Sequence, residues 1–172
     1  MSDMRPTPTH PLLPSLPPLP PWARALMDDP GYELLGKPSN QAQNWMHANP
    51  TGERIHTNYY VHRPTLALRA VTHFGREAEG RPGVAHGGAI ATVIDDVSGT
   101  TGWLSGKPVV SLNLNIDYRA FVPTGAWLLV EGRVTDVQGR KVWVTCTVTT
   151  PSADGAGEST LHAEAKGLFL QV

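Results

Sequence analysis

The sequence of 172 residues has a single cysteine and almost no net charge. Cys146 has no second cysteine with which to pair, so the chain forms no internal disulfide. The 14 Lys and Arg residues nearly balance the 15 Asp and Glu residues, whereas nucleic-acid binding usually needs a basic surface. No apolar run approaches the roughly 18 residues that span a membrane, and the N-terminus lacks a secretory signal pattern. We therefore expect a cytoplasmic protein that binds neither nucleic acid nor membrane.

The motifs of several common cofactor sites are also missing. The seven histidines form no HxxxH or HxxEH-type pair, which argues against a metal site. The sequence has neither a GxGxxG fingerprint nor a Walker A loop. Cys146 lies in a strand-like run, residues 142–148, where packing is its expected role rather than nucleophilic attack. We expect no metal and no redox cofactor.

The composition divides the chain into three parts. Residues 1–21 contain half of the sixteen prolines, which favour an extended chain without regular hydrogen bonds, so a disordered tail is expected there. Residues 22–53 contain short helical pieces, interrupted by Pro30 and Gly31, and are interpreted as an N-terminal cap. Residues 54–172 form the main domain.

The main domain reads as about six strands and one long helix. Residues rich in β-branched and aromatic side chains, separated by turn residues, predict the strands 55–62, 65–74, 109–121, 127–137, 141–150 and 160–170. In 109–121 the sequence alternates, with Leu112, Leu114, Ile116 and Tyr118 on one face and Ser111, Asn113, Asn115 and Asp117 on the other. A helix after two strands, followed by a meander, indicates an α+β fold in which an antiparallel sheet wraps around one helix.

The stretch 82–104 contains that central helix. It begins with a Pro-Gly turn and His86-Gly87-Gly88. An apolar stripe at helical spacing comprises Ile90, Val93, Ile94, Val97, Thr101 and Leu104. The opposite face carries small residues and one acid, namely Gly88, Ala91, Thr92, Asp95, Gly99 and Gly102. A helix of this kind is suited to being enclosed on both sides, and a carboxylate there is costly without a task or a partner.

The spacing of Gly88 and Asp95 indicates a shared site. Seven residues place both on one helical face but roughly 10 Å apart along the axis. One substrate carbonyl cannot reach both within a single chain. Two antiparallel helices would bring Gly88 of one chain near Asp95 of the other, so we expect at least a dimer.

Two motifs resemble a known family. His-Gly-Gly at 86–88 with Asp95 nine residues after the histidine resembles the signature of hotdog-fold acyl-CoA thioesterases, the PaaI-like type of the 4-hydroxybenzoyl-CoA thioesterase superfamily. The run 111–125, which begins Ser-Leu-Asn-Leu-Asn-Ile-Asp-Tyr-Arg, resembles the third strand of that family. The resemblance covers about residues 54 to 170 and implies a hotdog fold and an acyl-CoA substrate.

The resemblance also implies roles for single residues. Asp95 takes the position of the catalytic acid, which either attacks the carbonyl or removes a proton from water. Gly88 corresponds to the glycine whose N–H polarises the thioester carbonyl, beside Gly87, and Ser111 to the hydroxyl that holds the attacking water. His86 orients the loop, contacts the substrate or caps the helix. Asp96 leaves the small-residue face and is interpreted as a solvent-facing acid.

This sequence departs from the family at one position. Many relatives carry Asn or Gln about six residues before the histidine, as a second polarising group. Gly80, preceded by Glu79, stands here instead, so His86 or a water is left to supply that group. Arg119, Arg140 and Lys141 are candidates for contacts with the phosphates of coenzyme A.

We therefore predict a hotdog acyl-CoA thioesterase that is at least a dimer. The resemblance also implies that two dimers can pair into a tetramer. Two other interpretations stay open. A hotdog hydratase or dehydratase would use a His paired with an acid at a different spacing. A non-catalytic acyl-CoA sensor would keep the pocket but would not need Asp95 and Ser111.

Overall fold

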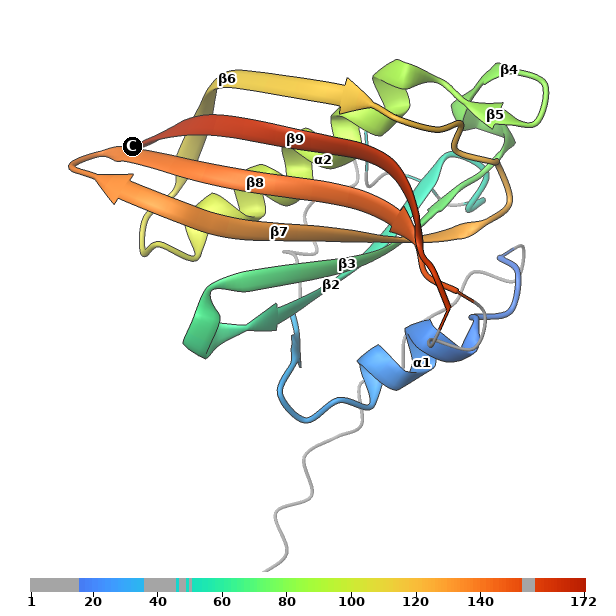
Figure 1. Ribbon diagram of the computed structural model, residues 1–172, viewed down its shortest axis with the longest axis horizontal. Helices are drawn as coiled ribbons and strands as arrows, with labels where there is room; N and C mark the ends of the chain where they lie inside the picture. The colour runs from blue at the N-terminus through green and yellow to red at the C-terminus, as the bar shows by residue number, and fades with distance from the viewer. Residues whose placement is uncertain (1–15, 36–45, 47–48, 50, 153–156) are drawn as a thin grey trace, which may run out of the picture.

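A computed structural model of the protein describes residues 16–35, 46, 49, 51–152 and 157–172. Its main feature is a seven-stranded antiparallel sheet in the order β1-β2-β3-β7-β8-β9-β6, with one long helix, α2, packed against it (Figure 1). The strands are β1 (Glu33–Leu34), β2 (Ile55–His62), β3 (Ala67–Phe74), β6 (Val109–Tyr118), β7 (Trp127–Gln138), β8 (Lys141–Thr150) and β9 (Thr160–Gln171). A two-stranded sheet, β4 (Glu79–Arg81) with β5 (Val84–Ala85), precedes α2 (Gly87–Trp103). Two short 3-10 helices, Arg63–Thr65 and Arg76–Ala78, flank β3.

The predicted α+β architecture is confirmed, and all six predicted strands are present near their predicted bounds. Three short strands were not predicted. β1 has only two residues, too few for a periodic pattern, and forms by pairing with Val61 and Tyr60 of β2. The segment expected to be a loop and a turn before the helix forms the β4–β5 sheet instead, with Gly83 at a φ of 76° in its turn. This small sheet places the start of α2 against the end of the main sheet.

The apolar stripe of α2 packs against one face of the sheet, as its spacing predicts. Val93, Ile94 and Val97 are fully buried and belong to one core cluster with Leu68, Phe74, Leu128, Val130 and Val148 of the strands. Burial of a side chain of this size stabilises the fold by about 1.5–3 kcal/mol. The opposite face of α2 is partly open within one chain, because Asp95 and Gly88 are exposed.

Strand β6 differs from its predicted alternation at its start. The pairing of β6 with β9 shifts between Ser111 and Asn113, so Leu112 is the additional residue of a β-bulge. Before the bulge the faces are exchanged: Ser111 points to α2, on the same side as Leu114 and Ile116. The prediction that Leu112 shares a face with Leu114 and Ile116, and that Ser111 lies on the other face, is therefore wrong, and Leu112 is 53% exposed.

The N-terminal segment covers the other face of the sheet. Helix α1 (Pro21–Met27) buries Ala23 and Leu26 in a second cluster with Leu19, Tyr60, Val71 and Trp127. Residues 22–35 of the expected cap therefore pack on the sheet, whereas residues 36–45, 47–48 and 50 lie outside the described residues. The expected tail, residues 1–21, is only partly tested, since residues 1–15 lie outside the described residues. Its final part is ordered, because Leu19 is buried and the Trp127 indole N–H donates to the Pro17 carbonyl at 3.1 Å.

Leu19→Ala should therefore destabilise the protein, although it lies in the proline-rich segment. Leu-to-Ala changes at buried sites cost about 2 kcal/mol or more, which corresponds to roughly 4–8 °C in Tm for a chain of this size. Pro18→Ala is the matched control, because Pro18 is exposed beside it and should change Tm little. Thermal unfolding of both variants measures the difference, and equal melting temperatures would show that the segment does not support the sheet.

Candidate active site

His86 caps the N-terminus of α2. Its backbone is extended, with φ −65° and ψ 138°, and its ring Nδ1 accepts a hydrogen bond from the Gly88 N–H at 2.8 Å. This arrangement satisfies one of the unpaired N–H groups of the first turn. Of the three roles considered for His86, capping is the one that the structure shows. A neutral ring that accepts at Nδ1 carries its proton on Nε2.

The cap changes which glycine offers a free donor. The Gly88 N–H, predicted to polarise a carbonyl, is already bonded to His86. The Gly87 N–H, one residue earlier, has no hydrogen-bond partner among the described residues. It lies at the first helical position, where the positive end of the helix dipole attracts a negatively charged oxygen. The available donor is therefore Gly87 rather than Gly88.

Asp95 and Ser111 meet across the helix and the edge strand. The Ser111 hydroxyl donates to Asp95 Oδ1 at 2.7 Å, and both residues are exposed in the single chain. The bulge at Leu112 makes this contact possible, because it turns Ser111 toward α2. The two residues selected from the sequence thus form one polar pair. Because the Ser111 proton is donated to Asp95, a water beside this pair can donate one hydrogen bond to the carboxylate and the other to the hydroxyl oxygen.

Asp96 is not the solvent-facing acid that its helical position predicts. Its Oδ2 accepts a short hydrogen bond from the hydroxyl of Tyr59, a buried residue of β2. Burial, followed by the charge of Asp96, raises the pKa of Tyr59 well above its usual value. The sequence could not reveal this pair, because Tyr59 and Asp96 are 37 positions apart. The adjacent acids therefore bind hydroxyls on different strands, Asp95 on β6 and Asp96 on β2.

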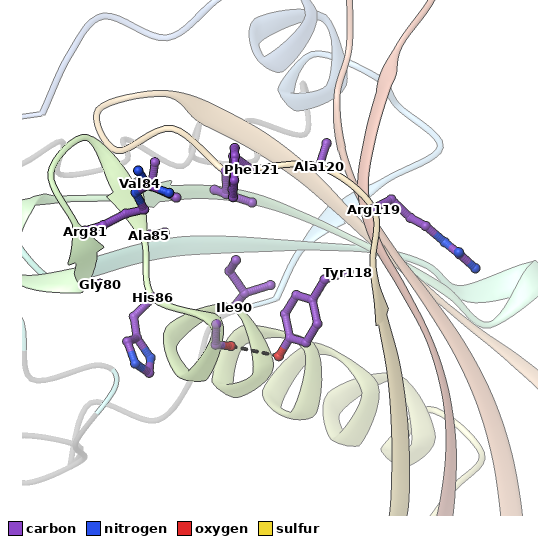
Figure 2. Close-up of a pocket in the computed structure, with 12 residues that line it drawn as sticks. Gly80, Arg81, Val84, Ala85, His86, Ile90, Tyr118, Arg119, Ala120 and Phe121 are labelled. Carbon is purple, nitrogen blue, oxygen red and sulfur yellow. Dashed lines mark hydrogen bonds between the residues drawn. The ribbon is translucent and has the colours of Figure 1, made fainter.

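A pocket of about 670 Å³ opens beside the start of α2. Its wall includes the β4–β5 sheet, the first turn of α2 and the segment that follows β6, and Figure 2 shows His86, Ile90 and Tyr118 around it. The Tyr118 hydroxyl donates to the Gly87 carbonyl at 2.9 Å. Gly80 lies against the His86 ring, where an added Cβ would come within 2.9 Å of Cδ2. The His86 ring therefore occupies the space that a side chain at position 80 would need.

Comparison with known proteins shows what the central part of the chain resembles. Residues 82–154, which include α2, Ser111 and the strands that follow, match the family model "Thioesterase superfamily". This stretch is therefore similar to that superfamily. The chain is 38% identical to the rat acyl-coenzyme A thioesterase THEM4 over 98 residues, which are 57% of this chain and 40% of the relative. It is 37% identical to the mouse THEM4 over 122 residues, which are 70% of this chain and 50% of the relative. The chain thus spans half or less of these two relatives.

Solved structures confirm the predicted hotdog fold. A Streptococcus mutans protein crystallised with acetyl CoA aligns with a TM-score of 0.59 and 23% identity, over 75% of this chain and 97% of that chain. Zebrafish thioesterase superfamily member 2 aligns with a TM-score of 0.55 and 20% identity, over 87% of this chain and 92% of that chain. Among the residues that the structure describes, no helix is long and apolar enough to cross a membrane.

The three predicted cations are not gathered at the pocket. Arg119 lines it, but its guanidinium is held by Glu164 at 2.7 Å and Asp117 at 3.3 Å. The hydrogen bond to Glu164, with the charges of both acids, raises the pKa of Arg119. Arg140 donates to the Gln171 carbonyl, and Lys141 lies beside it in the β7–β8 hairpin.

The β7–β8 hairpin and the pocket lie at opposite ends of α2. The Gln171 side chain reaches Ser105, just beyond the C-terminal end of α2, while the pocket lies at the N-terminal end. Seventeen helical residues span roughly 25 Å. Within one chain, Arg140 and Lys141 are therefore remote from Gly87.

Arg81 is a pocket cation that sequence reasoning missed. It lies on β4 with its guanidinium 5.7 Å from the centre of the Phe121 ring, and that ring is 71% exposed. Arg81 forms no ion pair among the described residues. No sequence pattern points to Arg81, because β4 has only three residues and is too short to show an alternation.

Proposed function

We propose that this chain hydrolyses acyl-CoA thioesters at a site shared between two copies. The contact of Ser111 with Asp95 carries the proposal, because it places a hydroxyl of β6 against a base on α2, the helix whose first N–H has no partner among the described residues. The family and its named acyl-coenzyme A thioesterase relatives support the reaction class. Since the chain spans only part of these relatives, the reaction remains our proposal for this protein.

In the proposed reaction Asp95 activates a water. The carboxylate accepts a proton from water held beside Ser111, and the water oxygen bonds to the thioester carbonyl carbon. The carbon–sulfur bond of the resulting tetrahedral intermediate then breaks. CoA leaves as its thiol after taking a proton, and the free acid remains. The neighbouring hydroxyl favours this role over direct attack by Asp95, because it gives the water a second fixed contact.

The Gly87 N–H stabilises the oxygen of that intermediate. It is the unpaired donor of the first turn, and glycine lets the substrate approach the backbone closely. A donor fixed before the reaction costs no rearrangement in the transition state. Gly80 has no side chain, and the His86 ring lies against it. In our proposal the His86 Nε2–H therefore acts as the second polarising group, in place of the Asn or Gln side chain that many relatives carry at position 80.

Two copies are needed because the groups are far apart in one chain. Gly87 and Asp95 are separated by roughly 12 Å along α2. Strand β6 is the edge of the sheet and exposes Val110 and Leu112, so it is suited to pairing with β6 of a second copy. Two-fold pairing there sets the two α2 helices antiparallel. One related fold is a hexameric acyl-CoA thioesterase, and whether this protein forms dimers or tetramers stays a prediction.

Arg81 is the cation that we propose for the phosphates of CoA, in place of Arg119. It lies at the pocket wall and has no acidic partner within the part of the chain that the structure describes, whereas Arg119 is paired with Glu164. Arg81→Ala should raise KM for an acyl-CoA about tenfold and leave KM unchanged for the matching acyl-N-acetylcysteamine thioester, which lacks phosphates. Arg133→Ala, an exposed arginine of β7, is the control. An equal loss with both thioesters would mean that Arg81 does not contact the phosphates.

Release of free thiol from a panel of acyl-CoA esters tests the function as a whole. Turnover of at least one ester by the purified protein supports hydrolysis. Binding of acyl-CoA without thiol release supports the sensor interpretation, and addition of water to an enoyl-CoA supports the hydratase. The cytoplasmic location and the lack of a cofactor stay predictions.

A further inference from the structure

We infer that Tyr118 is a positioning residue that clamps the first peptide of α2 and so aims the Gly87 N–H. The inference rests on the proposed function for its consequence in catalysis. Tyr118 was expected only to alternate with its neighbours on a strand, and nothing in the family motif assigns it a task.

The hydrogen bonds of one peptide group carry the argument. The Gly87 carbonyl and the Gly88 N–H belong to the same planar unit. The carbonyl accepts from the Tyr118 hydroxyl at 2.9 Å, and the N–H donates to His86 Nδ1 at 2.8 Å. Both ends of this peptide are thus tied to side chains from different elements, β6 and the helix cap. Figure 2 shows the bond from the Tyr118 hydroxyl.

These two hydrogen bonds restrict a part of the backbone that would otherwise be flexible. Two consecutive glycines allow close approach of a substrate, but they also leave the backbone with more conformational freedom than other residues. Helix ends fray, and a stabilising donor is useful only when its direction is fixed in advance. Holding the Gly87–Gly88 peptide fixes the orientation of the adjoining His86–Gly87 peptide, which carries the open N–H.

The exposure of Tyr118 indicates that its hydrogen bond to Gly87 does not serve core packing. Its side chain is 52% exposed and lies in the pocket wall, 3.7 Å from where a Cβ at Gly87 would stand. Its hydroxyl is therefore not part of the core. Tyr118→Phe keeps the ring and removes only the hydrogen bond to Gly87.

The experiment compares wild type, Tyr118→Phe and a control, Tyr32→Phe, which also removes one phenol hydroxyl but lies in the cluster of the N-terminal segment, away from α2. Tyr118→Phe should lower kcat about 10- to 100-fold with KM and Tm nearly unchanged, whereas Tyr32→Phe should keep kcat. Amide hydrogen exchange of Gly88, whose N–H is bonded to His86, should quicken in Tyr118→Phe alone. Exchange at wild-type rates, or an unchanged kcat, would overturn the clamp.

A spectroscopic measurement tests the direction of the N–H. In an Asp95→Asn background, which holds the thioester unhydrolysed, the carbonyl stretch of bound acyl-CoA should lie below its value in water. Adding Tyr118→Phe should move it back toward that value, and no movement would contradict the inference. If wild type hydrolyses no acyl-CoA while Tyr118→Phe still quickens exchange, the proposed function fails and the clamp stands.

Discussion

Asp95→Asn should abolish thioester hydrolysis while the fold and acyl-CoA binding persist. Asparagine has nearly the same size, and its amide oxygen can still accept the hydrogen bond from Ser111. It cannot take a proton from water, so the reaction loses its base. Positioned acid–base groups contribute about 10²–10⁴-fold in rate, and a loss in that range is expected in kcat. Thiol release and thermal unfolding measure the two effects separately.

Asp96→Asn is the informative comparison. The Tyr59 hydroxyl keeps an acceptor in this variant but loses a charged one, so a small decrease in Tm is expected with most of kcat retained. An inactive Asp96→Asn beside an active Asp95→Asn would move the catalytic role to the neighbouring acid. If both variants stayed active, the thioesterase proposal would lose its principal residue.

Gly87→Pro should also remove most of the activity, because proline deletes the one N–H proposed to stabilise the oxyanion. The position suits proline: it is the first of the helix, and His86 before it already has the extended conformation that a following proline requires. Loss of one such donor lowers kcat about 10²–10³-fold. The fold should persist, as thermal unfolding and circular dichroism can check.

Gly87→Ala is the matched control, because alanine keeps the N–H. Its Cβ would meet the Tyr118 ring at 3.7 Å or more, an ordinary contact. This variant should keep kcat within a few-fold of wild type. Equal activity of the proline and alanine variants would exclude the Gly87 N–H as the donor.

The sequence predicted the scaffold well because repeated patterns encode it. Helix α2 has an apolar stripe over five turns, and the six longer strands each have several residues of β character. The position of Asp95 near a strand hydroxyl followed from the family resemblance. The contact itself depends on the bulge at Leu112, which no alternating pattern could show.

The site differed from prediction where single contacts between distant residues decide it. Whether Gly87 or Gly88 has the open N–H depends on the rotamer of His86, and the sequence offers only three adjacent residues. The pairing of Asp96 with Tyr59 and of Arg119 with Glu164 joins positions 37 and 45 residues apart. Such pairs follow from the register of the sheet, which local spacing does not define.

Complementation between inactive variants tests the shared site most directly. Asp95→Asn and Gly87→Pro chains, carrying different tags, are combined and the mixed dimer is purified. One of its two sites then has both the Gly87 N–H and the Asp95 carboxylate, so about half of the wild-type activity per dimer should return from two inactive parents. If both groups acted within one chain, neither site of the mixed dimer would be complete, and an inactive mixed dimer would contradict the account.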